Sequence, residues 1–172
     1  MLTTECQRAA LHELRRYRGL AERAMAQVSD EDFFAAIDPE TNSIAVIVKH
    51  MAGNMRSRWT DFLTTDGEKA DRDRDGEFIL DATDTRESLE LRWNVGWDSA
   101  IATIEALQMD DLQRTVTIRG EPHRVLDAIN RQSTHYAYHV GQIVLLAKHF
   151  AGSQWRTLSI PPGRSREFPT VK

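Results

Sequence analysis

His135 and His139 stand four residues apart in the segment THYAYHVGQ. On a helix, residues at this spacing have Cβ atoms about 5–6 Å apart, so two imidazoles can converge on one ion at nitrogen–metal distances of about 2.0–2.1 Å. The spacing also arises often by chance, and two polar side chains on a solvent-facing stripe are the alternative interpretation. A metal site therefore needs a buried helix around the pair and a third ligand from elsewhere in the chain.

The helix that carries the pair is predicted over residues 123–150, and it is apolar around most of its circumference. At 3.6 residues per turn, one narrow polar stripe contains Gln132, His135, His139 and Gln142. A helix that is apolar nearly all round is typical of a buried helix, so we expect this stripe to face an interior cavity. Gly141 lies roughly opposite His139, and we expect another helix to approach closely there.

The third ligand has to come from the four other histidines. His123 lies about 18 Å before His135 on the predicted helix, and His149 lies about 15 Å after His139, so neither can share the ion. His12 sits among arginines and is expected to be exposed. By elimination His50 is the best third ligand. Its own helical stripe contains His50, Asn54, Ser57 and Asp61, and periodicity alone leaves open that this stripe is a solvated edge.

Helices before this one are predicted from apolar residues that recur at three- and four-residue steps. The first covers residues 4–28. The second begins near Ser43, which can cap its first turn, and ends near FLTTDG at 62–67. The third begins at Asp84, where DTRE matches a capping pattern with Glu87 at the third helical position.

Shorter elements complete the predicted fold. The sequence after Ser29 predicts a helical turn that plugs the bundle end, and TVTI with the turn signal RGEP predicts a β-hairpin between the third and fourth long helices. Residues 151–172 predict an irregular tail whose first half docks on the bundle through Trp155, Leu158 and Ile160. Together these elements predict an all-α fold, a four-helix bundle in one domain over residues 1–172.

Composition narrows the classes of function. The chain has 172 residues, of which 41% are hydrophobic and 28% charged, and its net charge of −4 argues against nucleic acid as a general partner. No run approaches the roughly 20 apolar residues that span a bilayer. Cys6 is the only cysteine, so an intrachain disulfide is excluded. We expect Cys6 to be a small core residue of the first helix. Because the chain needs no oxidising compartment, we expect a cytoplasmic protein.

Two other patterns favour structural interpretations. The stretch DRDRDGEFILDA at 71–82 begins like a calcium-binding loop, but its twelfth position is Ala82 where a bidentate Glu is needed, so a solvated loop is favoured. Trp59, Trp93 and Trp97 sit among aliphatic residues at helical spacing, which predicts core positions rather than a ligand cage.

The segments at 42–69, with KHMAGN, and at 114–150, with HYAYHVGQ, resemble the DinB-like superfamily and, within it, the DUF1572 branch. The likeness covers nearly the whole chain, including the tail WRTLSIPPGRS. It implies a four-helix bundle with a divalent metal held by three histidines, which correspond residue by residue to His50, His135 and His139. The superfamily includes thiol-dependent transferases for bacterial thiols such as bacillithiol and mycothiol, while many members, this branch included, have no established reaction.

Two classes of function follow from these patterns. As an enzyme, the chain would bind zinc or nickel, both suited to imidazole, with a coordination position open for water or a thiolate. Gln132, Gln142 and Asn54 would orient ligands or substrate, and apart from the distant Asp61 no carboxylate in the stripes is an obvious general base. A transferase or hydrolase using a low-molecular-weight thiol or metal-bound water is expected. No catalytic residue is assigned.

The alternative is a non-enzymatic, metal-stabilised bundle that binds a small molecule or a partner. For either class we expect a homodimer, because long bundle helices and apolar aromatic content leave surface to cover, and relatives of this type often pair.

Overall fold

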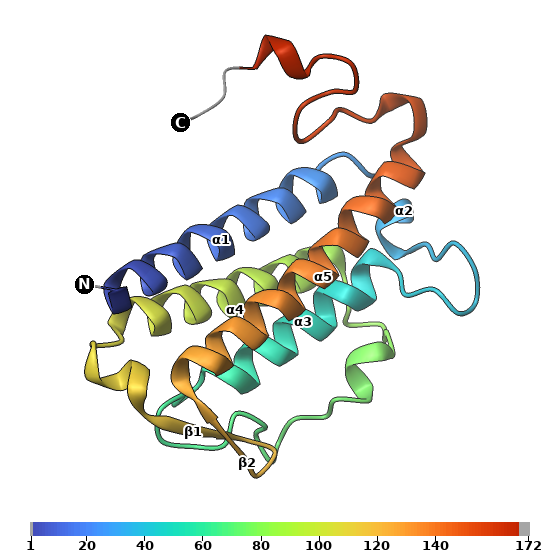
Figure 1. Cartoon of the computed structure of the whole chain (residues 1–172). Helices are drawn as coiled ribbons and strands as arrows, with labels where there is room; N and C mark the ends of the chain where they lie inside the picture. The colour runs from blue at the N-terminus through green and yellow to red at the C-terminus, as the bar shows by residue number, and fades with distance from the viewer. Residues whose placement is uncertain (1, 169–172) are drawn as a thin grey trace.

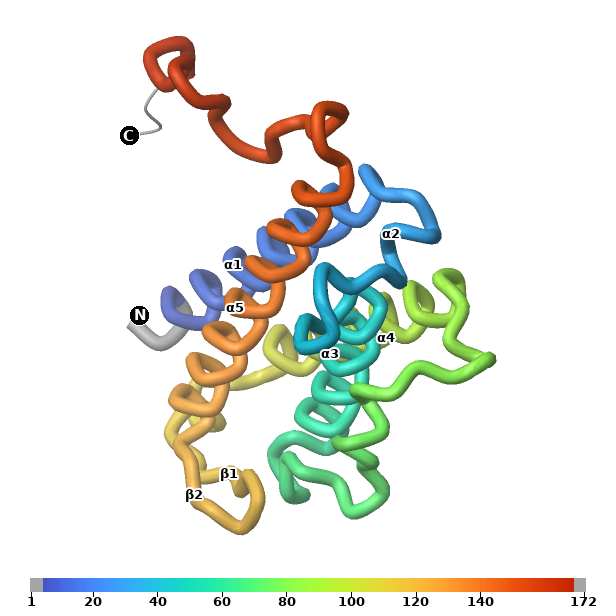
Figure 2. The backbone as a smooth tube through the Cα atoms, turned by 90° about the vertical axis from the view of Figure 1, so that its right-hand side faces the viewer, coloured from blue at the N-terminus to red at the C-terminus, as the bar shows by residue number. Residues whose placement is uncertain are grey.

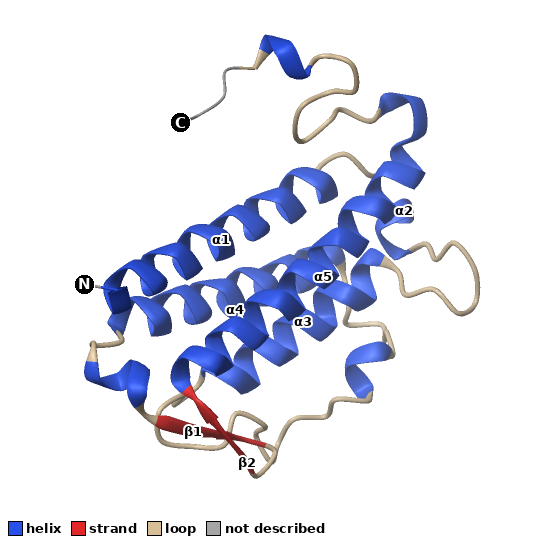
Figure 3. Ribbon diagram, in the orientation of Figure 1, coloured by secondary structure: helices blue, strands red, loops and turns tan. Residues whose placement is uncertain are grey.

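The computed structural model describes residues 2–168, and the side chains of residues 5–168. Within them, four long helices form a bundle, α1 (Leu2–Met25), α3 (Ile44–Trp59), α4 (Arg86–Ala106) and α5 (Val125–Ala151), with short α2 (Asp30–Phe34) and the antiparallel strands β1 (Thr115–Ile118) and β2 (Glu121–Arg124) (Figures 1 and 3). Four 3-10 turns accompany them: η1 (Gly76–Phe78), η2 (Asp110–Gln113), η3 (Gly152–Gln154) and η4 (Ser165–Glu167). The predicted all-α bundle with a hairpin before its last helix is confirmed.

The long helices pack most closely in two pairs, α1 with α5 and α3 with α4 (Figure 2). The core between them contains the three predicted tryptophans, Trp59, Trp93 and Trp97, all fully buried. Trp97 packs edge-on against Tyr136 of α5 at a centroid distance of 5.3 Å, which ties the two pairs together. None of the described helices is both long enough and apolar enough to cross a membrane.

Two predicted helix boundaries are wrong for identifiable reasons. α3 ends at Trp59 rather than within 62–67, because Asp61 has a φ of +48° and its carbonyl closes a turn with the amides of Thr64 and Thr65. α4 is capped by Thr85 and not by Asp84. The Asp84 carboxylate is buried and instead accepts a hydrogen bond from Lys49 Nζ at 2.7 Å.

The predicted start of the fourth long helix at His123 is also wrong. His123 and Arg124 pair with β1 in the hairpin, so α5 begins only at Val125. The predicted turn after Ser29 is confirmed as α2, where the Ser29 hydroxyl accepts from the amide of Asp32.

Three predictions about the burial of side chains are also wrong, at least in part. Cys6, predicted in the core, is exposed. The fourth long helix is not buried all round, because Tyr138 and Leu145 are 63% and 65% exposed. In the tail, Trp155 and Leu158 pack against the core as predicted, while Ile160 is largely exposed.

The predicted close approach at Gly141 is wrong as well, because this residue faces solvent and a Cβ there would contact nothing within 4 Å. The close approach occurs at Gly96 of α4. A Cβ at Gly96 would lie 3.1 Å from Cβ of Met55 and 3.6 Å from Cα of Ala52, both on α3. This contact lets α3 and α4 pack tightly along one side of the bundle.

The two glycines should therefore respond in opposite directions to substitution. Gly141→Ala should raise the free energy of unfolding by about 0.5–1 kcal/mol, since it removes an exposed glycine from a helix interior. Gly96→Leu should lower it by about 1–3 kcal/mol, because the added side chain has no space against Met55. Urea unfolding measures the free energy of unfolding of both variants. Equal changes in that free energy for the two variants would contradict the packing described for α3 and α4.

Candidate metal centre

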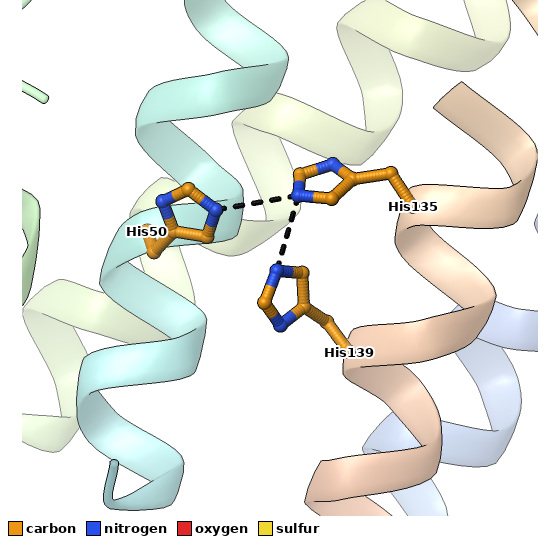
Figure 4. Close-up of side chains that lie close together, drawn as sticks. All are labelled: His50, His135 and His139. Atoms are coloured by element: carbon orange, nitrogen blue, oxygen red, sulfur yellow. Dashed lines mark hydrogen bonds between the residues drawn. The ribbon is translucent and has the colours of Figure 1, made fainter. Parts of the chain in front are cut away.

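The three predicted ligands meet between α3 and α5. His50 lies in the middle of α3, and His135 and His139 lie one turn apart on α5 (Figure 4). Nε2 of His135 is 3.0 Å from Nε2 of His139 and 3.4 Å from Nε2 of His50. Among the described residues, these are the only three potential metal-binding groups that come together in one cluster.

The nitrogen separations suit one shared ion. Two ligands about 2.1 Å from a metal, at bond angles of roughly 90–110°, lie about 3.0–3.4 Å apart. The distances from Nε2 of His135 to Nε2 of His139 and of His50 fall in that interval, and the three ligand atoms all lie within 4.8 Å of one another. The donor set therefore fits a divalent ion that accepts imidazole, such as zinc or nickel.

His50 is buried, so the solvated-edge interpretation of its stripe is wrong. Its Nδ1 lies 2.9 Å from Oε2 of Glu77, a buried carboxylate supplied by η1, and Phe78 packs against its ring. Arg72 in turn donates to both oxygens of Glu77, at 2.7 Å each. This pairing holds the imidazole in one orientation, with Nε2 toward α5.

Glu77 is ionised in this setting. Burial alone would raise the pKa of its carboxyl, but the hydrogen bonds from His50 and Arg72 and the positive charge of Arg72 outweigh burial and lower that pKa. An ionised carboxylate only accepts hydrogen bonds, so Nδ1 of His50 carries the proton and Nε2 is left free to bind a metal.

His139 is oriented in a similar way. Its Nδ1 lies 2.8 Å from Oε1 of Gln142, and an amide oxygen can only accept, so Nε2 of His139 is again the free nitrogen. Gln142 thus has the orienting role predicted for it. Asn54 and Gln132 make no hydrogen bond to the three histidines: Asn54 accepts from the Tyr136 hydroxyl, whose oxygen also accepts from the Trp59 indole.

The surroundings of His135 and His139 disfavour the charged form of both imidazoles. Burial lowers the pKa of His135 to about 3, and repulsion of a proton there by Arg131 and Arg72, and by His139 or His50 when either is protonated, acts in the same direction. Burial also lowers the pKa of His139, although the hydrogen bond to Gln142 opposes this. Neutral imidazole is the form that binds a metal, so the site is prepared for an ion.

The three histidines line a cavity of about 610 Å³ that also contacts the hairpin turn and the loop after α3. The other histidines lie elsewhere: His12 and His149 are exposed, and His123 is half-buried on β2. The exposed Asp61 is not among the residues that line the cavity.

Glu77 is the residue of the candidate site that the sequence did not indicate, because it lies in the stretch interpreted as a solvated loop. The sequence signal that could have indicated a close neighbour of His50 is Gly53, three residues after it in KHMAGN. A Cβ at Gly53 would overlap the Glu77 carboxylate, so glycine leaves the space through which this carboxylate reaches His50.

Metal-free protein should lose stability as the pH falls below about 6.5. Between this value and the lowered pKa of His135, about 3, the unfolded chain carries a proton that the folded chain lacks. The free energy of unfolding should therefore decrease across this interval. Urea unfolding at several pH values measures the slope, which should be shallower for His135→Gln and unchanged for His149→Ala. An unchanged slope in His135→Gln would contradict the lowered pKa.

Comparison with known proteins identifies the family of this chain. A family model described as "Protein of unknown function (DUF1572)" matches residues 2–164, a span that contains all four long helices, the hairpin and the three histidines. No curated protein and no solved structure matches the chain. The resemblance seen in KHMAGN and HYAYHVGQ is thereby confirmed, and the chain belongs to the DUF1572 family.

Proposed function

We propose that this chain is a divalent-metal-dependent enzyme in which His50, His135 and His139 hold the ion. The observation that carries the proposal is the convergence of three imidazoles at the wall of a cavity of about 610 Å³. Structural zinc sites are closed by four protein ligands, whereas catalytic sites keep one position open. No fourth histidine, cysteine or carboxylate joins the cluster among the described residues, and the cavity gives a substrate access to it.

The reaction proposed is a group transfer or hydrolysis. When bound, zinc or nickel would supply a Lewis acid that activates water or the thiolate of a low-molecular-weight thiol. Among the described residues no carboxylate lines the cavity, so the chain's own side chains are suited to binding and orientation rather than to proton abstraction. Gln142 contributes by bridging His139 to the Tyr138 hydroxyl, to which its Nε2 donates at 3.1 Å.

Turnover tests this proposal against a purely structural metal. Protein of measured metal content is incubated with low-molecular-weight thiols and an electrophilic acceptor, and separately with an activated ester. Product formation that requires the metal and disappears in His135→Ala would support an enzyme. A metal that raises the melting temperature without turnover in either assay would favour the metal-stabilised binding bundle. Light scattering on the same samples tests the predicted homodimer.

Removing one histidine should release most of the metal. His139→Ala leaves two imidazoles, which rarely retain an ion against a mild chelator. His149→Ala is the matched control, since it removes an exposed histidine ten residues further along the same helix. Metal analysis after dialysis against the chelator measures the occupancy. Full occupancy in His139→Ala together with metal loss in His149→Ala would contradict the assigned ligands.

The Glu77 carboxylate, which accepts from Nδ1 of His50, should affect metal affinity almost as strongly as a metal ligand does. Glu77→Gln should weaken metal affinity by roughly 10- to 100-fold, because the amide is a poorer acceptor for the Nδ1–H of His50. Glu68→Gln is the control: Glu68 also pairs with Arg72, at 3.0 Å, but is not bonded to a histidine. Competition with a chelator of known affinity measures both variants. Equal losses of metal affinity in the two variants would contradict this prediction, because they would show that the ion pair with Arg72, and not the hydrogen bond to His50, supports metal binding.

A further inference from the structure

The cavity beside the histidines has a strongly positive wall. Five guanidinium groups from four separate segments line it, those of Arg58, Arg72, Arg74, Arg119 and Arg131. Among the described residues, the carboxylates at ion-pair distance from them are Glu68, Glu77 and Asp75. Glu68 alone is shared by three of the arginines. At least two positive charges are therefore unbalanced before any metal binds.

The least balanced of these charges lie on Arg131 and Arg58. Arg131 is one turn before His135 on α5, and no carboxylate among the described side chains pairs with it. The Gln132 side-chain amide is oriented with its nitrogen toward Oδ1 of Asn54. In this orientation the Gln132 side-chain oxygen accepts from Arg131 Nη1 at 3.1 Å and from Arg58 Nε at 3.0 Å. Arg58 is 2% exposed, and its Nη1 has no hydrogen-bond partner among the described residues. Two like charges on one neutral oxygen favour the binding of an anion.

Arg119 is presented by an unusual turn. Arg119 and Gly120 join the two strands with φ values of +57° and +75°, a conformation for which Asn-Gly is the common choice. The turn is stabilised by Asp66, whose carboxylate accepts from the amides of Arg119 at 2.9 Å and of Gly120 at 2.8 Å. An arginine is thus held in a left-handed conformation where it lines the cavity.

We propose that these arginines bind the carboxylate or phosphate group of a small organic anion, and that this anion is the substrate. Guanidinium groups bind both kinds of oxyanion through paired N–H donors. A cavity of about 610 Å³ has the size of a small-molecule site. Calling the anion a substrate rests on the proposed function, whereas its binding by the arginines does not.

Calorimetric titration of the full-length protein tests this inference, with the metal content of each sample measured. The probes are succinate, inorganic phosphate and succinamide, the uncharged counterpart of succinate. The protein should bind at least one anion and not succinamide, and the tighter anion identifies the head group. Arg131→Gln and Arg119→Gln should each weaken anion binding roughly tenfold or more at unchanged metal content. Arg8→Gln removes the same charge from the exposed side of α1 and should bind like the unmodified protein.

The inference would be overturned by no binding of either anion, by equal binding of succinamide, or by unchanged affinity in both cavity variants. Binding that requires the metal and ignores the arginine substitutions would place the anion on the ion and would overturn it too. The metal content of each sample tests the proposed function independently of anion binding. A protein that binds anions through these arginines but holds no metal would contradict the metal-dependent enzyme and leave the anion site standing.

Discussion

The hydrogen bond between Glu77 and His50 is the interaction on which the candidate site depends. A carboxylate buried without partners would be costly, and Glu77 is stable in the bundle because Arg72 pairs with both its oxygens. In return, the ionised carboxylate fixes the tautomer of His50 and directs its free nitrogen toward α5. The same contact fastens the long segment between α3 and α4 onto α3, so that one polar network both orders this loop and prepares a ligand.

The packing of the bundle explains why the site lies where it does. α3 and α4 approach closely around Gly96, and α1 lies along α5, which leaves the seam between α3 and α5 for larger polar side chains. Buried hydrogen bonds from the Trp59 indole to Tyr136 and from Tyr136 to Asn54 cross this seam. Asn54 and the three histidines also line the cavity. These hydrogen bonds join α3 to α5 beside the histidines and so help to set the separation at which three imidazoles can meet.

Charge is distributed unevenly between the molecule and its cavity. The whole chain is acidic, with a net charge of −4, yet the cavity wall has an excess of arginines. Arg131 and Arg72 also contribute to the lowered pKa of His135, after burial and the neighbouring histidines. One positive environment thus has two effects: it adds to the lowering of the pKa of His135, and it would favour an anion beside the histidines.

The sequence by itself determined the number and order of the long helices, the hairpin and the choice of three histidines. Helical periodicity and β-branched residues are local properties, and the i, i+4 spacing of His135 and His139 fixes their separation on any helix. What only the tertiary structure decided is which faces are buried and which distant groups meet. Gly141 and Cys6 were misjudged because periodicity does not tell which side of a helix has a neighbour. Glu77, Arg72 and Arg119 lie in a loop and a turn, where no repeat predicts a direction. Their roles depend on long-range contacts that form only when the loop folds back onto α3 and the hairpin closes beside it.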